Sequence, residues 1–206
     1  GDGKLDAGIY SAQNVVRVAI STGEGFNAPV HWSTGLEGSG EKLIAGDFNG
    51  DGKTDVLAVK ANGLAVALSA GDRFVSAGPW LEGVNTDGLE VLAADFNADH
   101  LTDIALVDKS SGTWQVALST GRRFTSPAVW ISGFSSGSVA AMDLNRDGLS
   151  DAVAFSSGEL RFARSTGRSF VSPQLFMSGL ERMPALADFN ADGLPDLSVF
   201  NPDTCV

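Results

Sequence analysis

The sequence has one cysteine and few positive charges, and each shortage excludes a class of protein. Its 206 residues include one cysteine, Cys205, so no disulfide within the chain can hold the fold together. We expect this thiol to be a free surface residue, the alternative being a link to another chain. The 14 lysines and arginines face 25 aspartates and glutamates, which gives a formal charge of −11. Nucleic-acid binding needs clustered positive charge, so we expect no nucleic-acid partner.

Long apolar runs are also missing. None reaches the roughly 18 residues that a membrane helix requires, so the sequence predicts no membrane span. No signal peptide is visible, yet Gly1 falls inside a repeated motif. We therefore expect an excised or processed piece of a secreted, extracellular or cell-surface protein, whose targeting signal is not in this chain.

The motifs of common enzymes are absent as well. The sequence has no His-Glu-x-x-His, no Gly-x-Ser-x-Gly and no Walker phosphate loop. Residues 23–28 match a dinucleotide fingerprint, but no helical pattern follows them. His31 lies beside Trp32 in an expected edge strand, and we interpret it as a surface residue. No spacing suggests glycosidase or lyase chemistry for the irregular acids, so we expect no enzyme. These acids are Glu37, Glu41, Glu82, Glu90, Glu159 and Glu181.

What the sequence does contain is a tandem repeat. Four nine-residue stretches share the pattern Asp-x-Asn-x-Asp-x-x-x-Asp and align without gaps. They begin at Asp47, Asp95, Asp143 and Asp188, which are 48, 48 and 45 residues apart. A truncated copy occupies residues 1–6. A Ser-Thr-Gly or Ser-Ala-Gly motif recurs at 21–23, 69–71, 119–121 and 165–167. This period predicts repeats at about 1–41 (partial), 42–89, 90–137, 138–182 and 183–206 (partial) within a single propeller or propeller fragment, residues 1–206.

Within each repeat, the apolar residues are arranged as in strands. Short apolar runs flank the Asp loop, as at 43–45 and 56–59, and a third run ends at the Ser-Thr-Gly turn. A fourth run carries aromatic residues and usually a proline, which is typical of an edge strand. No segment has a helical period over ten residues. The sequence therefore predicts an all-β fold, a β-propeller of four-stranded antiparallel blades.

The number of blades stays open at this point. About four full repeats and a partial one are compatible with a closed four- or five-bladed ring in which both termini share a blade. They are equally compatible with a fragment that another segment or chain completes.

One aromatic position recurs in the fourth run of each repeat, as Trp32, Trp80 and Trp130, with Phe176 in the last full repeat. In one interpretation these side chains pack between neighbouring blades, because blades are apolar on both faces. In the other interpretation, the three tryptophans form an exposed platform for a ligand such as a sugar.

The Asp loops offer the chemistry of a calcium site. Calcium prefers six to eight oxygen ligands, and loop positions 1, 3, 5 and 9 all carry side-chain oxygens. Position 7 varies in side chain, which suits a backbone carbonyl ligand. The expected ligands are Asp47, Asn49, Asp51, Lys53 and Asp55; Asp95, Asn97, Asp99, Leu101 and Asp103; Asp143, Asn145, Asp147, Leu149 and Asp151; and Asp188, Asn190, Asp192, Leu194 and Asp196.

An EF-hand, a transition-metal site and a plain turn each fit these loops less well. An EF-hand needs flanking helices and a glutamate at position 12, which here is Ala58, Leu106, Ala154 or Val199. Zinc, copper and iron would want sulfur or imidazole ligands. A purely structural turn of Asp, Asn and Gly does not require three carboxylates at fixed positions. Four Ca²⁺ ions would bring the formal charge from −11 to −3, and we expect the metal to be structural.

The copies are unequal. Position 6 favours glycine because the turn there needs a positive φ, but the second copy has His100. We expect a strained or weaker site in that copy. The opening copy keeps only Asp2 and Asp6, with Lys4 at the carbonyl position, and we expect it not to hold metal alone.

The Asp loop followed by its apolar strand resembles the FG-GAP/VCBS repeats of integrin-α-like propellers, and the resemblance covers essentially the whole chain. It implies a calcium-binding β-propeller, commonly seven-bladed, of a kind used in cell adhesion, glycan recognition or large secreted proteins and toxins. Two hypotheses follow for this chain. It is a calcium-stabilised binding or scaffolding module for a glycan or protein partner, or a module of a larger secreted enzyme or toxin whose active part lies elsewhere.

Overall fold

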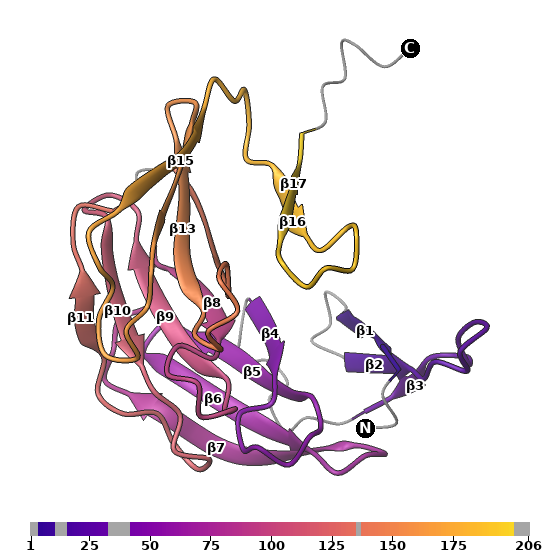
Figure 1. The fold of residues 1–206 in the computed structure, drawn as a ribbon. Coiled ribbons are helices and arrows are strands. Elements are labelled where there is room, and N and C mark those ends of the chain that lie inside the picture. The colour runs from indigo at the N-terminus through magenta and orange to yellow at the C-terminus, as the bar shows by residue number, and fades with distance from the viewer. Residues whose placement is uncertain (1–3, 11–15, 33–41, 135–136, 200–206) are drawn as a thin grey trace. The chain divides into compact units, whose positions relative to one another are not determined.

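A computed structural model of the protein describes residues 4–10, 16–32, 42–134 and 137–199 (Figure 1). Within these ranges the regular elements are all strands, as the sequence predicts, and no helix is present that could cross a membrane. The expectations for Asp2, Glu37, Glu41 and Cys205 lie outside the described residues.

Three four-stranded antiparallel sheets form the main part of the fold, each with its strands in chain order. Two smaller sheets precede and follow them in sequence. The full sheets are β4 (Lys42–Gly46), β5 (Asp55–Lys60), β6 (Gly63–Ser69) and β7 (Phe74–Glu82); β8 (Glu90–Ala94), β9 (Asp103–Asp108), β10 (Thr113–Ala117) and β11 (Ala128–Ile131); and β12 (Ser138–Met142), β13 (Asp151–Ser156), β14 (Glu159–Ala163) and β15 (Gln174–Ser178). The smaller ones are β1 (Ala7–Tyr10), β2 (Val16–Ala19) and β3 (Val30–His31), and β16 (Ala185–Ala187) with β17 (Asp196–Ser198).

The fourth strand of each full sheet lies at an edge, as its proline predicts. Each of these edge strands also has a β-bulge where the repeated aromatic residue occurs. Leu64 pairs with Leu81 and Ala65 with Pro79, so Trp80 is the extra residue. The same two-to-one pairing occurs at Trp130 in β11 and at Phe176 in β15. A bulge bends its strand and redirects a side chain, which accounts for the recurrence of a large aromatic residue at this point.

The chain divides into two compact units. The first contains residues 1–88, 101–103 and 119–126, and the second contains 89–100, 104–118 and 127–206. The division runs through the repeat at 90–137, because parts of its Asp loop and its Ser-Thr-Gly turn belong with the sheet before it. A repeat in the sequence is therefore not a closed unit of packing.

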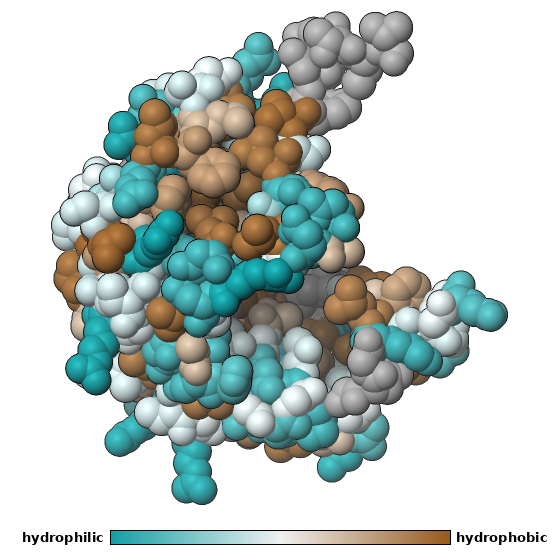
Figure 2. All heavy atoms as spheres, in the orientation of Figure 1, coloured by the Kyte–Doolittle hydropathy of each residue, from teal (hydrophilic) through white to brown (hydrophobic). Residues whose placement is uncertain are grey.

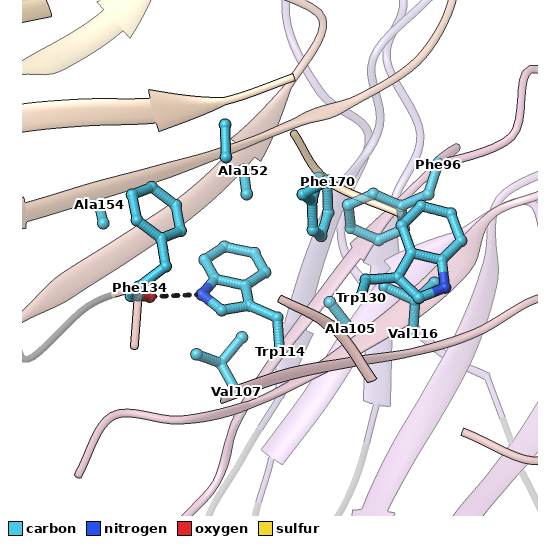
Figure 3. Close-up of a cluster of buried hydrophobic side chains, with 11 residues drawn as sticks. Phe96, Ala105, Val107, Trp114, Val116, Trp130, Phe134, Ala152, Ala154 and Phe170 are labelled. Carbon is cyan, nitrogen blue, oxygen red and sulfur yellow. Dashed lines mark hydrogen bonds between the residues drawn. The ribbon is translucent and has the colours of Figure 1, made fainter. Parts of the chain in front are cut away.

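The core of the second unit lies between the sheets β8–β11 and β12–β15 (Figure 3). Trp114 is fully buried, stacks on Phe134 with ring centroids 6.0 Å apart, and meets the edge of Phe170. The opposing face of β13 supplies Ala152 and Ala154, whose small side chains leave room for these rings. The first strands of the two sheets, β8 and β12, lie beside each other. Four consecutive residues of β9, Ile104 to Val107, are buried, so both faces of that sheet are apolar, as expected of a propeller blade.

The outer strand β15 differs from its counterparts in exposing its apolar side chains. Leu175, Phe176 and Met177 are 51%, 50% and 41% exposed. Figure 2 shows apolar atoms gathered over the part of the surface where β13 and β15 lie. Phe176 takes the place of Trp32, Trp80 and Trp130 in this repeat. Its ring meets the ring of Phe162 edge to face, with the ring centroids 5.9 Å apart.

Candidate metal-binding loops

The four Asp loops share one backbone shape, with a left-handed residue at positions 4 and 6. The values of φ in the first loop are 75° at Gly50 and 78° at Gly52. At position 6, His100 adopts φ 66°, a conformation that costs a non-glycine residue roughly 1–2 kcal/mol. The strain expected there is present. The positive φ at position 4 is not evident from sequence, because the other loops place Ala98, Arg146 and Ala191 there.

Side-chain oxygens at positions 1, 3 and 5 are turned toward the backbone of their own loop. In the first loop, the Asp47 carboxylate accepts hydrogen bonds from the N–H groups of Gly50 at 2.7 Å and Gly52 at 2.8 Å. Asn49 Oδ1 accepts from the Asp51 N–H at 3.1 Å, and Asp51 Oδ1 from the Lys53 N–H at 3.0 Å. The bond from position 6 to position 1 and the bond from position 5 to position 3 recur in the other three loops. The loop conformation is therefore set by its own residues.

The aspartate at position 9 has a separate role. Asp55, Asp103 and Asp151 are fully buried, and burial raises the pKa of Asp55 to about 6 and also raises that of Asp151. One oxygen of each accepts a hydrogen bond from the serine N–H of the Ser-Thr-Gly or Ser-Ala-Gly turn, at 2.8, 2.7 and 2.8 Å. The second oxygen of Asp55 accepts from the Phe48 N–H at 3.1 Å. This residue connects the two repeated motifs within a blade.

This hydrogen bond between the position 9 aspartate and the serine was not predicted from the sequence, although the spacing of the two residues in the sequence indicates it. The bonded pairs are 14, 16 and 14 residues apart in the three full blades, and Asp6 accepts from the Ser21 N–H 15 residues later. A buried carboxylate needs hydrogen-bond donors. An aspartate and a serine repeating at nearly constant separation on neighbouring strands are the pattern that such a pair produces.

Successive loops are joined to each other in both units by what we call the loop-to-loop contact. In the first unit the Thr102 N–H donates to the Asp47 carbonyl at 2.7 Å, and the Ser119 hydroxyl donates to the Phe48 carbonyl at 2.7 Å. In the second unit Ser150 and Ser165 make the same bonds to the carbonyls of Asp95 and Phe96, both at 2.8 Å. The fourth loop has Pro195 at the position of Thr102 and Ser150, and proline has no N–H to donate.

Aromatic rings surround the same junction. Phe124 of the first unit meets Phe48 and Trp80 with centroids 5.8 and 5.6 Å away, and its N–H donates to the Trp80 carbonyl. Phe170 meets Phe96 and Trp130 in the second unit in the same way. Trp32, Trp80 and Trp130 are 7%, 4% and 7% exposed. This burial agrees with the packing interpretation and leaves little indole surface for a ligand.

The chemistry of the loops fits a hard cation. Each offers three carboxylates and an amide oxygen, and these oxygens retain lone pairs beyond the hydrogen bonds that they accept. Positions 3 and 5 lie together, since the amide of Asn97 donates to Asp99 at 2.9 Å and Asn145 and Asn190 make the same contact to Asp147 and Asp192. Across the described ranges, however, no three Asp, Glu, His or Cys side chains gather as a metal cluster.

The first loop has a cation of its own. The Lys53 ammonium lies 2.8 Å from Asp51 Oδ2, and this hydrogen bond lowers the pKa of Asp51. The other loops have Leu101, Leu149 or Leu194 at this position. Lys53 therefore competes with any metal for the position 5 carboxylate in this loop.

Comparison with known proteins places this pattern in a family. The model of the FG-GAP-like repeat matches four overlapping stretches, residues 1–58, 47–106, 95–154 and 143–199. A search of curated proteins finds no match.

The solved structures that share the fold include the following two. One is a lectin of Agrocybe aegerita, described in terms of specific recognition of non-reducing terminal N-acetylglucosamine; it is 20% identical with a TM-score of 0.69 over 86% of this chain and 50% of the lectin chain. The other is the Tc holotoxin pore of Photorhabdus luminescens, 18% identical with a TM-score of 0.67 over 96% of this chain and 10% of that one. The chain thus spans half the length of the lectin chain. At these identities the likeness establishes the fold, a β-propeller of four-stranded blades.

Proposed function

The chain belongs to the FG-GAP-like repeat family, and on that premise we propose that it is a calcium-stabilised propeller module that binds a glycan. The observation that carries the proposal is the fourfold occurrence of one oxygen-rich loop in one conformation. A fold shared with a lectin supports a glycan as the partner. A protein partner, or another chain that completes the propeller, is the competing outcome of the tests below.

Calcium would be held in each loop by the side chains at positions 1, 3, 5 and 9 and the carbonyl at position 7. The ion would supply positive charge where three carboxylates are crowded, and so stabilise the folded form over the unfolded chain. Support comes from the donor set and from the buried position 9 aspartates, whose ionised form is disfavoured without a nearby positive charge.

We also propose that the module is not catalytic and acts outside the cell. Two of the acids outside the loops are engaged in ion pairs, Glu90 with Lys109 at 3.5 Å and Glu159 with Arg161 at 2.8 Å. His31 is exposed in β3, as a surface residue of an edge strand would be. Extracellular calcium is abundant enough to fill sites of modest affinity.

A second candidate is a module of a larger secreted toxin or enzyme whose active part lies outside this chain. The likeness to the Tc holotoxin, which covers 96% of this chain but 10% of that one, favours it. In that case the propeller serves as a scaffold and need not bind sugar.

The two candidates separate in one screen. The protein is applied to a glycan array in calcium and again in excess EDTA, with melting curves recorded in both buffers. We expect glycan binding and a higher melting temperature in calcium, and loss of both on chelation. A folded protein that binds no glycan would favour the scaffold, and identical melting curves would contradict the structural calcium.

A further inference from the structure

A cavity of about 390 Å³ lies in the second unit, away from the Asp loops. It is lined by the β9–β10 turn, the segment after β11 and the face of β13 and β14. Because each Asp loop joins the first and second strands, a turn between the second and third strands lies at the opposite end of the sheet. The volume falls at the lower end of the range of roughly 300–1,000 Å³ for small-molecule sites.

The floor of the cavity is apolar and belongs to the packed core. Phe134 is 3% exposed and packs in the same cluster as Ala154, a small residue that leaves space beside the ring. The Trp114 indole N–H donates to the Phe134 carbonyl at 2.8 Å, which fixes this segment against the core (Figure 3). A ligand would therefore meet a preformed surface.

One wall carries an ion pair. Ala154 pairs with Arg161 and Ser156 with Glu159 across β13 and β14, so the four side chains share one face of the sheet. Arg161 Nε donates to Glu159 Oε2 at 2.8 Å. A guanidinium has five N–H donors and this bond uses one, so Arg161 can donate to a ligand while it stays paired.

The other wall carries two oriented hydroxyl groups. Ser110 and Ser111 donate to the two oxygens of Asp108 at 2.6 and 2.7 Å. These hydrogen bonds hold the pKa of Asp108 at about 2, so the acceptor stays ionised and the serine hydrogens stay directed toward it. Ser111 Oγ also lies 2.9 Å from the Thr113 hydroxyl, which takes up one of its two lone pairs, so Ser111 keeps one lone pair and Ser110 more for the hydroxyl groups of a ligand.

The charged pair in this lining occurs in one of the three full sheets, since the sheet β8–β11 has Thr113 and Gln115 at the places of Glu159 and Arg161. In the sheet β4–β7, the places of Glu159 and Arg161 are taken by Gly63 and Ala65, which pair with Lys60 and Ala58. The turn beside the cavity also holds Ser157 at φ 53°, although non-glycine residues seldom adopt this conformation. Packing of one blade on another does not require these residues, which points to a ligand.

We propose that this cavity is the subsite for a single neutral pyranose at the end of a glycan, which rests on the proposed function and specifies its site. Phe134 and Ala154, which are almost fully buried, would close the base of the site beneath the sugar. Arg161 would donate to the sugar hydroxyls, and the two serines would accept from them. An acidic sugar fits poorly, because the ion pair of Glu159 and Arg161 leaves no net positive charge and the chain carries −11.

The test titrates the full chain in calcium with methyl glycosides of glucose, galactose, mannose and N-acetylglucosamine, and with N-acetylneuraminic acid as the acidic probe. Arg161→Ala removes the donor, and Ser110→Trp fills the mouth of the cavity. Arg73→Ala is the matched control, because Arg73 also pairs with a neighbouring carboxylate, Asp72 at 3.0 Å, but lies in the other unit. Melting curves confirm that each variant is folded.

We expect at least one neutral glycoside to bind, with affinity about tenfold or more weaker in Arg161→Ala, since that is the worth of a hydrogen bond to a charged group. Binding should be lost in Ser110→Trp and unchanged in Arg73→Ala. Equal binding by all folded variants would overturn the site but leave a glycan-binding module. Tighter binding of N-acetylneuraminic acid than of the neutral glycosides would overturn the proposal that the cavity takes a neutral sugar. No binding of any glycan by the unaltered protein would remove both the site and the proposed function.

Discussion

Two loops with similar sequences, residues 47–55 and 188–196, lie in different surroundings. Six of their nine residues are identical. Their internal hydrogen bonds also agree: the position 6 N–H donates to Asp47 at 2.8 Å in one and to Asp188 at 2.7 Å in the other. The nine residues evidently contain the information for their own shape.

Burial separates the two loops. Phe48 at position 2 is fully buried, whereas Phe189 at the same position is 60% exposed. Thr102, Ser119 and Phe124 of the following repeat cover the first loop, and no later Ser-Thr-Gly turn covers the last loop within the ranges that the structure describes. A loop of this family thus obtains its conformation locally and its packing from its neighbour.

Removal of calcium by a chelator is expected to change stability the most. It tests whether the metal stabilises the covered loop, residues 47–55, and the uncovered loop, residues 188–196, alike. At 100 times the dissociation constant, each site adds about 2.7 kcal/mol to the free energy of unfolding, if it does not bind the unfolded chain. EDTA should therefore lower the melting temperature strongly. Hydrogen exchange of the Gly52 and Gly193 amides should speed up in both loops. Faster exchange at Gly193 alone would show that only the uncovered loop depends on metal.

Truncating the position 2 ring comes next. Phe48→Ala should cost about 3–5 kcal/mol of unfolding free energy, because it leaves a cavity under Phe124. Phe189→Ala should change stability by less than about 0.5 kcal/mol, as is usual for an exposed position. Urea denaturation of both variants measures the difference. Equal losses would mean that Phe189 is covered in solution.

The hydrogen bonds of the loop-to-loop contact are expected to contribute less to the free energy of unfolding than the Phe48 ring does. Ser119→Ala removes the donor to the Phe48 carbonyl in a buried setting and should cost about 1–3 kcal/mol. Ser21→Ala is the control, because Ser21 is only partly buried and its hydroxyl accepts from the nearby Gly23 N–H. Urea denaturation again gives the values. A neutral Ser119→Ala would show that the ring packing alone holds the junction.

Relieving the strained position should stabilise the second loop slightly. His100→Gly removes a left-handed conformation that costs a non-glycine residue roughly 1–2 kcal/mol, although glycine loses more entropy on folding. We expect a gain in unfolding free energy of about 1 kcal/mol and tighter calcium binding at this loop. Gly148→His in the third loop is the reciprocal change and should lose a similar amount. Gains in both variants would contradict a role for backbone strain.

The smallest effect is expected at the first loop. Lys53→Leu gives it the residue that the other loops have and removes the ammonium 2.8 Å from Asp51. Calcium affinity should rise a few-fold, since an exposed ion pair of this kind is weak. Calorimetric titration measures the change, with Lys60→Leu as a control outside the loops. Weaker binding after Lys53→Leu would show that the lysine assists the site.

Much of this fold could be predicted from the sequence because its determinants are local and repeated. The spacing of Asp47, Asp95 and Asp143 revealed the repeat, and the short apolar runs indicated four strands in each. The proline in each outer run placed it at an edge, and the glycine preference at position 6 anticipated the strain at His100.

The remaining features depend on contacts between segments that no local pattern reveals. The bulge that redirects Trp80 and Trp130 appears only in the strand register, and the bonds from Thr102 and Ser119 join residues 55 and 71 positions apart from their partners. The cavity beside Phe134 arises where two blades meet, and no spacing in the sequence associates Ser110 with Arg161.

The loop-to-loop contact also bears on how such proteins grow and shrink in evolution. The two junctions described, from the first loop to the second repeat and from the second loop to the third, use the same atoms, so duplication of a period that contains one of them creates a new junction of the same kind. The matched family stretches, such as 47–106 and 95–154, run from one loop past the next and so contain two successive loops each. A gene that gains or loses about 48 codons keeps such junctions intact, whereas gain or loss of half a period would leave a loop facing the wrong strand.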